Sequence, residues 1–180
     1  GIEYSRNLMT VRIAKILGLE EILDLSKKLN IYEEIPELLS VSLGAAETTL
    51  LNLTSAYAPF VNGGNKVDPN LIKRIQDRRG NTIYQPRKRN CSGCDKFISN
   101  DEVELPKIRN TSEKVFSEET AFQMTSILQG AVQRGTAKKL RSLKVPLAGK
   151  TGTTNDNYDA WFIGFSSNLV IGVYIGYDNP

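Results

Sequence analysis

The centre of the stretch PLAGKTGTTNDNYDAWFIGF, residues 146–165, is compatible with two different chemistries, and each predicts a different local structure. Gly149-Lys150-Thr151 could end a phosphate-binding loop, but the GxxxxGK[ST] pattern requires a glycine where Lys144 stands. Such a loop also opens a helix, whereas here Gly152, a turn and the strand-like segment AWFIGF follow. We therefore reject nucleotide binding and interpret the lysine as part of a strand.

Around this stretch the sequence predicts helices followed by a sheet. Three strand-like segments run from Pro146 onward without helical crossovers, which favours antiparallel pairing. The predicted helices are residues 8–17, capped by Ser5 and stopped by Gly18; 20–29; 50–61, stopped by Gly63 and Gly64; 118–131, capped by Ser117; and a short basic helix after Thr136. The predicted class is α+β, with an antiparallel sheet packed by the helices that precede it.

The middle of the chain is predicted to be a hairpin followed by a long loop. Residues 71–85 have strand chemistry with Gly80-Asn81 at the turn, and residues 86–112 are a polar loop or insertion within one domain spanning 1–180. The loop contains Cys91 and Cys94 in a CxxC, without a second CxxC or any histidine to complete a zinc site. A local disulfide, free thiols and an intermolecular metal site are the alternatives, in that order.

Composition excludes several classes of function. The 180 residues are 40% apolar, enough for one core, and a net charge of +3 is too small to predict nucleic-acid binding. Basic residues around the hairpin are interpreted as a solvated surface rather than a contact for anionic lipid head groups. No signal peptide and no apolar run of about 18 residues is present. Histidine is absent, which excludes a Ser-His-Asp triad.

Lysine and serine are left to move protons, and two short motifs supply them. Ser5-Arg6-Asn7 is an SxN triplet at the head of the first predicted helix, and residues 150–153 read KTGT. Serine acyl-transfer enzymes that react with penicillin combine these two elements with an upstream SxxK, whose serine is the nucleophile. The order and the predicted secondary structure of both triplets match that combination.

The chain resembles the bifunctional class A penicillin-binding proteins, specifically the C-terminal part of their transpeptidase domain. The residues that carry the resemblance are YSRNLMTVRIAKILG, SLGAAETTLLNLTSAYAPFVNGG, MTSILQGAVQRGTA, LAGKTGTTNDNYDAWFIGF and IGVYIGYDN. The resemblance implies an incomplete penicillin-binding/β-lactamase-like transpeptidase fold and a reaction without a metal or cofactor. Its substrate would be the D-Ala-D-Ala bond of a peptidoglycan stem, opened through an acyl-serine that β-lactams also form. It further implies the periplasmic face of the bacterial inner membrane, with anchoring through a part outside this chain.

The same resemblance assigns roles to individual residues. Ser5 would bridge the nucleophile's lysine to Lys150 and relay a proton to the departing D-alanine, while Asn7 would donate its amide to the acyl donor's carbonyl. Lys150 would supply positive potential for the substrate carboxylate. Thr151 and Thr153 would bind that carboxylate, Gly152 would leave the strand edge bare, and the N–H of Thr153 would be an oxyanion donor.

The sequence departs from the family pattern in one respect, because no SxxK precedes Ser5. We therefore expect a fragment of a larger enzyme that does not react with penicillin by itself and whose exposed strand edge favours self-association. A β-lactamase or carboxypeptidase would share KTG, but the class A segments argue against it. A non-catalytic module that binds peptidoglycan or a partner protein through the same fold is the alternative function.

Overall fold

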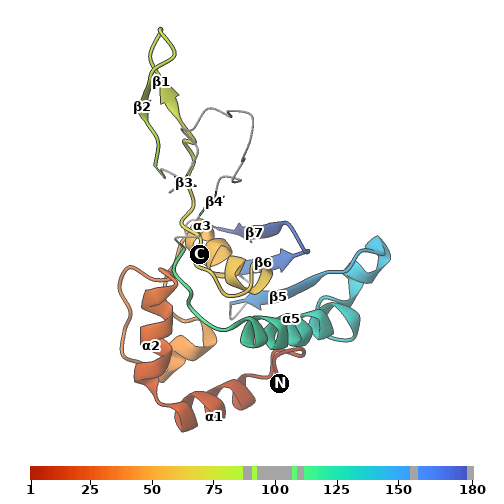
Figure 1. Ribbon diagram of the computed structural model, residues 1–180. Helices are drawn as coiled ribbons and strands as arrows, with labels where there is room; N and C mark the ends of the chain where they lie inside the picture. Colours follow the sequence, from red (N-terminus) through yellow and green to blue (C-terminus); the bar gives the residue numbers. More distant parts are fainter. Residues whose placement is uncertain (87–90, 93–106, 109–111, 155–157, 178–180) are drawn as a thin grey trace. The chain divides into compact units, whose positions relative to one another are not determined.

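The computed structural model describes residues 1–86, 91–92, 107–108, 112–154 and 158–177 (Figure 1). They belong to two compact units, each described by itself: Gly1–Val67 with Lys114–Pro180, and Asp68–Glu113. The first unit has the predicted α+β organisation, with helices preceding and packing an antiparallel sheet. Among the described residues, no helix has the length and apolar character needed to span a bilayer.

The first unit begins with α1 (Asn7–Leu17) and α2 (Leu19–Lys28), separated by Gly18. The predicted stop is confirmed: Gly18 has φ 92° and its N–H bonds to the Ala14 carbonyl at 3.0 Å. The predicted cap is wrong. Arg6 is the N-cap and makes no side-chain capping bond, while Ser5 has φ 52°, in the left-handed region, although an N-cap needs an extended backbone.

The predicted helix over residues 50–61 is two helices, α3 (Leu50–Ala56) and α4 (Ala58–Val61). Pro59 explains the break, because it lacks the N–H that would bond to the carbonyl four residues earlier. The Pro59 side chain is fully buried, so the residue that ends α3 also belongs to the core. A short 3-10 helix, η1 (Leu39–Leu43), lies between α2 and α3, where the sequence predicted no helix.

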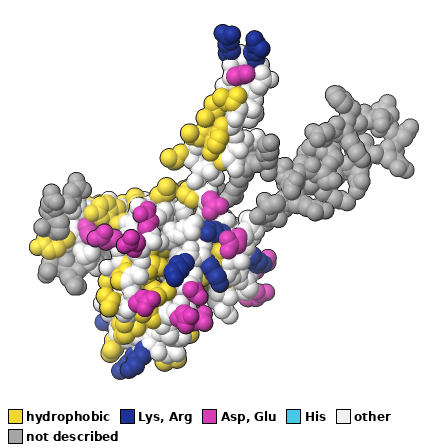
Figure 2. Space-filling model, turned by 90° about the vertical axis from the view of Figure 1, so that its left-hand side faces the viewer, with side chains coloured by type: hydrophobic (Ala, Val, Ile, Leu, Met, Phe, Trp, Pro, Cys, Tyr) yellow, Lys and Arg dark blue, Asp and Glu magenta, His cyan; other side chains and the backbone are white. Residues whose placement is uncertain are grey.

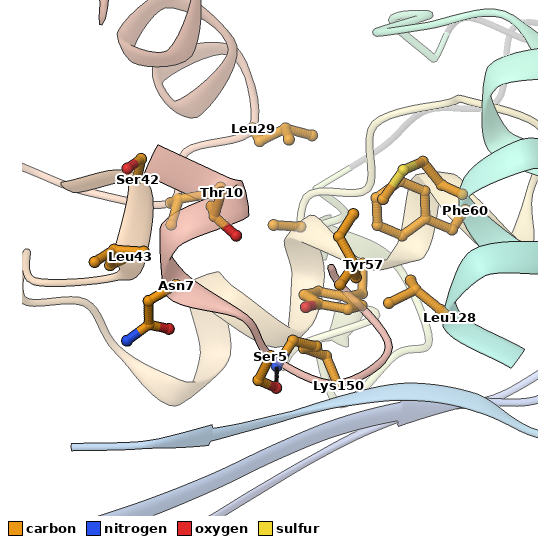
Figure 3. Close-up of a pocket in the computed structure, with 14 residues that line it drawn as sticks. Ser5, Asn7, Thr10, Leu29, Ser42, Leu43, Tyr57, Phe60, Leu128 and Lys150 are labelled. Carbon is orange, nitrogen blue, oxygen red and sulfur yellow. Dashed lines mark hydrogen bonds between the residues drawn. The ribbon is translucent and has the colours of Figure 1, made fainter. Parts of the chain in front are cut away.

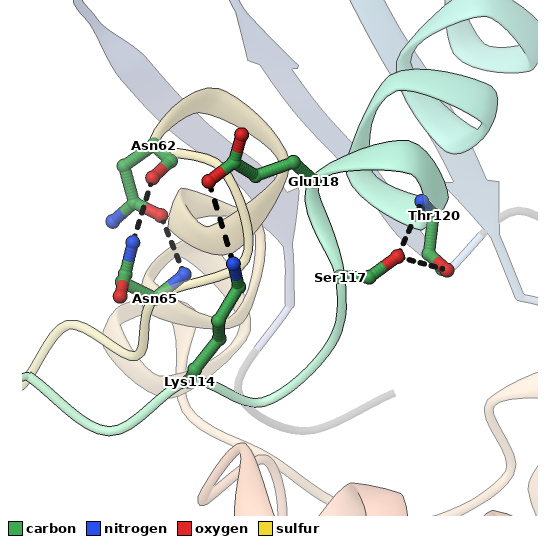
Figure 4. A network of polar contacts seen from close by, with 6 residues as sticks. All are labelled: Asn62, Asn65, Lys114, Ser117, Glu118 and Thr120. Carbon is green, nitrogen blue, oxygen red and sulfur yellow. Dashed lines mark hydrogen bonds and ion pairs between the residues drawn. The ribbon is translucent and has the colours of Figure 1, made fainter.

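The helix α5 (Glu118–Gln133) matches its prediction closely. Ser117 caps it by accepting the N–H of Thr120 at 3.2 Å, as Figure 4 shows, and Glu118 and Glu119 lie in its first turn, where acidic side chains are stabilising. The predicted short basic helix is the 3-10 helix η2 (Lys138–Leu143).

Three strands close the first unit: β5 (Ala148–Thr153), β6 (Asp159–Phe165) and β7 (Val170–Gly176). They are antiparallel in the order β5-β6-β7, as predicted, so β5 is an edge strand of this sheet. Leu128 of α5 packs on Ala148 and Phe165, with Tyr57, Phe60 and other apolar side chains around them. Figure 1 shows α5 running beside β5. The core therefore lies directly behind the strand that carries Lys150.

The second unit contains the predicted hairpin, β1 (Ile75–Gln76) paired with β2 (Thr82–Tyr84), in shorter strands than expected. Its turn is held by the Asp77 carboxylate, which accepts the N–H groups of Arg79 and Asn81 at 2.8 and 2.9 Å. Lys and Arg side chains gather at the tip (Figure 2). The short strands β3 (Cys91–Ser92) and β4 (Lys107–Ile108) pair antiparallel, and most of the predicted 86–112 loop, with Cys94, lies outside the described residues.

Candidate active site

The strand β5 carries Lys150 to the turn that precedes α1. The Lys150 ammonium donates to the Ser5 hydroxyl at 2.5 Å (Figure 3). It also donates to the Thr151 carbonyl at 2.6 Å. Side chains alternate along a strand, so Lys150 points to the same face as Ala148, which is buried in the core. Burial of Ala148 therefore fixes the position of the strand at Lys150, and the ammonium lies at the margin of the core. Two motifs 145 residues apart in the sequence meet at this point.

The Ser5 hydroxyl is available to Lys150 because Ser5 does not cap α1. Its N–H bonds to the Ile2 carbonyl at 3.1 Å, and the next N–H, of Arg6, bonds to the Gly1 carbonyl at 2.8 Å. This tight turn gives Ser5 its φ of 52°. A left-handed backbone costs a residue with a side chain about 1–2 kcal/mol. Strain of this kind is tolerated mainly where the surrounding structure enforces it, as it does at many functional sites.

Burial lowers the pKa of the Lys150 ammonium below its ordinary value, because desolvation disfavours the charged form. Among the residues that the structure describes, no carboxylate forms an ion pair with Lys150 that would oppose this effect. The ammonium is half-buried and bonded to two neutral oxygens. It is therefore a cation whose charge remains available for an incoming anion.

A cavity of about 320 Å³ opens beside this pair, and Ser5, Asn7 and Lys150 all line it. Asn7, the first residue of α1, lies on the α1 side of the cavity in Figure 3 and is not hydrogen-bonded to Ser5 or Lys150. The opposite wall is apolar and includes Tyr57 and Phe60, whose rings meet edge to face at 5.5 Å. Burial raises the pKa of Tyr57 to about 12, which keeps its hydroxyl neutral.

The residues that follow Lys150 form an exposed strand edge. Gly152 is exposed and a side chain there would approach the Cβ of Trp161, at 3.3 Å. Thr153 is exposed too, whereas the Thr151 hydroxyl lies 2.9 Å from that of Thr136. An edge strand with a bare position offers backbone groups to an extended peptide. The structure thus brings Lys150, Ser5 and Asn7 to one cavity, whereas residues 151–153 continue β5 beyond Lys150 and do not line that cavity.

Sequence reasoning missed three residues of this neighbourhood: Glu3, Arg134 and Thr136. They join the Ser5 turn to the end of α5 through contacts between segments 131 or more residues apart, for which no local pattern is a signal. The structure confirms that Lys150 is not in a phosphate-binding loop. Lys150 lies inside β5, and the described residues after it (151–154 and 158–177) contain strands and no helix.

An ammonium hydrogen-bonded to a hydroxyl beside a cavity can pass protons and attract an anion. It cannot form an acyl intermediate alone, and none of the serines in the 180 residues is followed by a lysine three positions later. The geometry therefore fits an acyl-transfer site in which these groups assist a nucleophile rather than act as one.

Comparison with known sequences agrees with this chemistry. A family model described as the penicillin binding protein transpeptidase domain matches residues 1–180. Penicillin-binding protein 1A of Rickettsia prowazekii is 44% identical over 183 residues, covering 100% of this chain and 23% of the relative. Penicillin-binding protein 1A of Pseudomonas aeruginosa is 34% identical, covering 98% of this chain and 25% of the relative. The chain thus spans about a quarter of the length of these relatives.

Solved structures show the same fold. The crystal structure of penicillin-binding protein 1A from Haemophilus influenzae matches with a TM-score of 0.80 and 28% identity, over 99% of this chain and 29% of that one. An imipenem acyl-enzyme complex of penicillin-binding protein A from Mycobacterium tuberculosis matches with a TM-score of 0.70 at 16% identity, over 97% of this chain and 41% of that one, which is a likeness of fold alone. As the sequence resemblance predicted, this chain belongs to the penicillin-binding protein transpeptidase domain family.

Proposed function

We propose that these 180 residues form two walls of a serine-type D,D-transpeptidase site, and that the nucleophilic serine comes from a part of the protein outside them. That serine attacks the D-Ala-D-Ala bond of a peptidoglycan stem, and the acyl group then passes to an amine of a neighbouring stem. The single observation that carries the proposal is the hydrogen bond between Lys150 on an edge strand and Ser5 of the SxN triplet. Family membership supports it.

Ser5 and Lys150 act together as a proton relay in this proposal. As the peptide C–N bond breaks, the Ser5 hydroxyl donates its proton to the departing amine of D-alanine, and the Lys150 ammonium gives a proton back to Ser5. The lowered pKa of Lys150 assists, because a less basic ammonium gives up its proton more readily. Positioned proton transfer of this kind contributes roughly 10² to 10⁴ in rate.

The strand edge binds the acyl donor. The substrate backbone lies along β5 at Gly152, and its terminal carboxylate is held by the Lys150 charge and the hydroxyls of Thr151 and Thr153. The N–H of Thr153 stabilises the oxyanion, a contribution commonly worth about 3 kcal/mol of barrier. Asn7 donates its amide to the donor's peptide carbonyl from the other side of the cavity.

The partners and the location of the whole protein belong to the same proposal. Peptidoglycan stems and β-lactams are its ligands, because a strained β-lactam amide meets the nucleophile in place of D-Ala-D-Ala. The site faces the periplasm, with anchoring to the inner membrane through a segment outside these residues. Cofactors are not required for acyl transfer by this relay.

Fluorescent-penicillin labelling tests the proposal. The full-length protein should form a covalent adduct that survives denaturing gel electrophoresis, and prior treatment with unlabelled penicillin should abolish the signal. The 180-residue chain should stay unlabelled, because positioned donors do not replace a covalent nucleophile. A labelled 180-residue chain would disprove the assignment of the nucleophile to another segment. A full-length protein that binds peptidoglycan without labelling would instead be a non-catalytic binding module.

A further inference from the structure

The turn that holds Ser5 is fastened to the end of α5 by Glu3. Arg134 donates from Nε to Glu3 Oε2 at 2.9 Å and from Nη2 to Oε1 at 2.5 Å, which makes the ion pair bidentate. The Glu3 side chain is only 20% exposed, whereas that of Arg134 is 59% exposed, so the carboxylate is shielded from water and the guanidinium is not. The bidentate geometry and partial burial distinguish it from the Lys114–Glu118 pair, whose side chains are 52% and 75% exposed.

A second connection runs through the backbone. The Thr136 N–H donates to the Glu3 carbonyl at 3.1 Å, and the Thr136 hydroxyl meets that of Thr151 at 2.9 Å. Thr151 adjoins Lys150 on β5, and Lys150 bonds to Ser5, two residues beyond Glu3. The contacts therefore form a closed ring in which the Ser5 turn, the end of α5 and β5 each hold the next.

Two glycines of α5 and its C-terminal turn make room for Glu3. A Cβ at Gly130 would collide with the Glu3 carboxylate and lie 2.9 Å from Arg134 Nη2, and a Cβ at Gly135 would collide with the Glu3 carbonyl oxygen. A glycine inside a helix costs about 1 kcal/mol relative to alanine, so Gly130 is unfavourable for α5 itself. Its presence is explained by the space that the ion pair occupies.

We propose that Glu3 is a positioning residue of the reaction, acting through Ser5. This inference rests on the proposed transpeptidase function. Ser5 stays at φ 52° only while its turn is clamped, because release would let the backbone relax to negative φ and carry the hydroxyl away from Lys150. Glu3 does not line the cavity, so its loss should slow the chemical step and leave ligand binding intact.

The decisive variant is Gly130→Ala in the full-length protein, because it displaces the ion pair without weakening α5. The added methyl group meets the ends of two flexible side chains, and alanine favours the helix. We expect the saturating rate constant of penicillin acylation to fall roughly tenfold to a hundredfold, as for a misplacement of about 1 Å. The half-saturating concentration should change less than about twofold and the melting temperature should not fall. Glu3→Gln should act on acylation in the same way.

The double variant Glu3→Arg with Arg134→Glu exchanges the two charges and should be acylated faster than Glu3→Gln, because an ion pair can form again. The control is Glu118→Gln, which breaks the exposed Lys114–Glu118 pair and should leave the acylation rate unchanged. If Ser5→Ala abolishes acylation but Gly130→Ala and Glu3→Gln keep the wild-type rate, Glu3 has no positioning role. The proposed function would still stand in that case. A fall in melting temperature that accounts for the whole rate loss would also overturn the role of Glu3. A wild-type protein that is not acylated would refute the proposed function instead.

Discussion

Ser5 and Ser117 both lie just before a helix in the sequence, but they differ in backbone conformation and in the hydrogen bond that each hydroxyl accepts. Ser117 has φ −70° and caps α5 by accepting the N–H of Thr120 at 3.2 Å. Ser5 has φ 52°, caps nothing and accepts the Lys150 ammonium at 2.5 Å. A serine that leaves its helix uncapped has its hydroxyl free for chemistry. The difference separates a serine that stabilises a helix from one whose hydroxyl is bonded to Lys150 beside the cavity.

The surroundings of each serine explain the difference. Ser117 itself has an extended backbone, with φ −70° and ψ 162°, which is the state that capping requires. The chain before Ser5 is a tight turn closed by the Gly1 and Ile2 carbonyls and tied to Arg134 through Glu3. The local sequence permits both states, and distant residues select one.

The largest expected effect is that of Ser5→Ala on acylation in the full-length protein. If Ser5 relays a proton, the rate of penicillin acylation should fall by roughly 10² to 10⁴, because the relay loses its hydroxyl. The melting temperature should hardly change, since no helical N–H loses a partner. Stopped-flow acylation and thermal unfolding measure the two quantities. Unchanged acylation together with a loss of stability would make Ser5 a structural residue like Ser117.

The second expected effect is a pH dependence of the acylation rate and of the free energy of unfolding. It should arise at the Ser5–Lys150 contact and not at the Ser117 cap. Lys150 titrates, whereas the peptide N–H that Ser117 accepts does not. Burial lowers the pKa of Lys150 below its ordinary 10.5, so acylation should fall on the alkaline side with a midpoint below that value. Between the folded pKa and 10.5 the unfolded state binds more protons, so the free energy of unfolding should rise with pH there.

Rate profiles and unfolding curves over the same pH range, for the wild type and for Lys150→Met, test this prediction. The alkaline increase in stability assigned to Lys150 should disappear in the variant. Lys139→Met, which changes an exposed lysine of η2, is the matched control and should retain it. An alkaline limb with its midpoint above 10.5 would contradict the desolvation of Lys150.

The smallest effect is expected from Ser117→Ala. Loss of an N-cap side chain costs about 1 kcal/mol, because the N–H of Thr120 loses its acceptor. Chemical denaturation of the full-length protein should show this decrease, and acylation measured well below the melting temperature should be unchanged. Ser117→Asp, which can also cap, should retain the stability. A loss of acylation in Ser117→Ala without a loss of stability would contradict a purely structural role.

Local chemistry accounts for most of what the sequence predicted correctly. Gly18 ends α1, Ser117 begins α5 and Gly80 lies in the hairpin turn, because each satisfies a short-range backbone requirement. The wrong predictions had non-local or competing causes. The cap at Ser5 failed because the turn before α1 holds Ser5 at φ 52°, outside the extended backbone that capping needs. The helix over 50–61 was divided because Pro59 outweighed the apolar spacing.

The residues of the candidate site also differ in whether a local sequence pattern could reveal them. Its motif residues, including Ser5, Asn7 and Lys150, were found from order and spacing together with the family resemblance. Glu3, Arg134 and Thr136 were not found, since an ion pair between segments 131 residues apart has no local pattern. Their roles, like those of the motif residues, remain proposals that the acylation experiments test.

The amino-acid sequence was enough to locate most of the helices and strands, to exclude histidine chemistry and to place Lys150 on a strand rather than in a phosphate loop. These are properties of neighbouring residues and of residue types. Three features follow from the tertiary structure instead: Ser5 adopts a left-handed backbone, its hydroxyl bonds to Lys150, and Glu3 holds the turn through Arg134. The reason is physical: a strained conformation persists only when contacts from distant segments stabilise it, and those contacts exist only after the chain has folded.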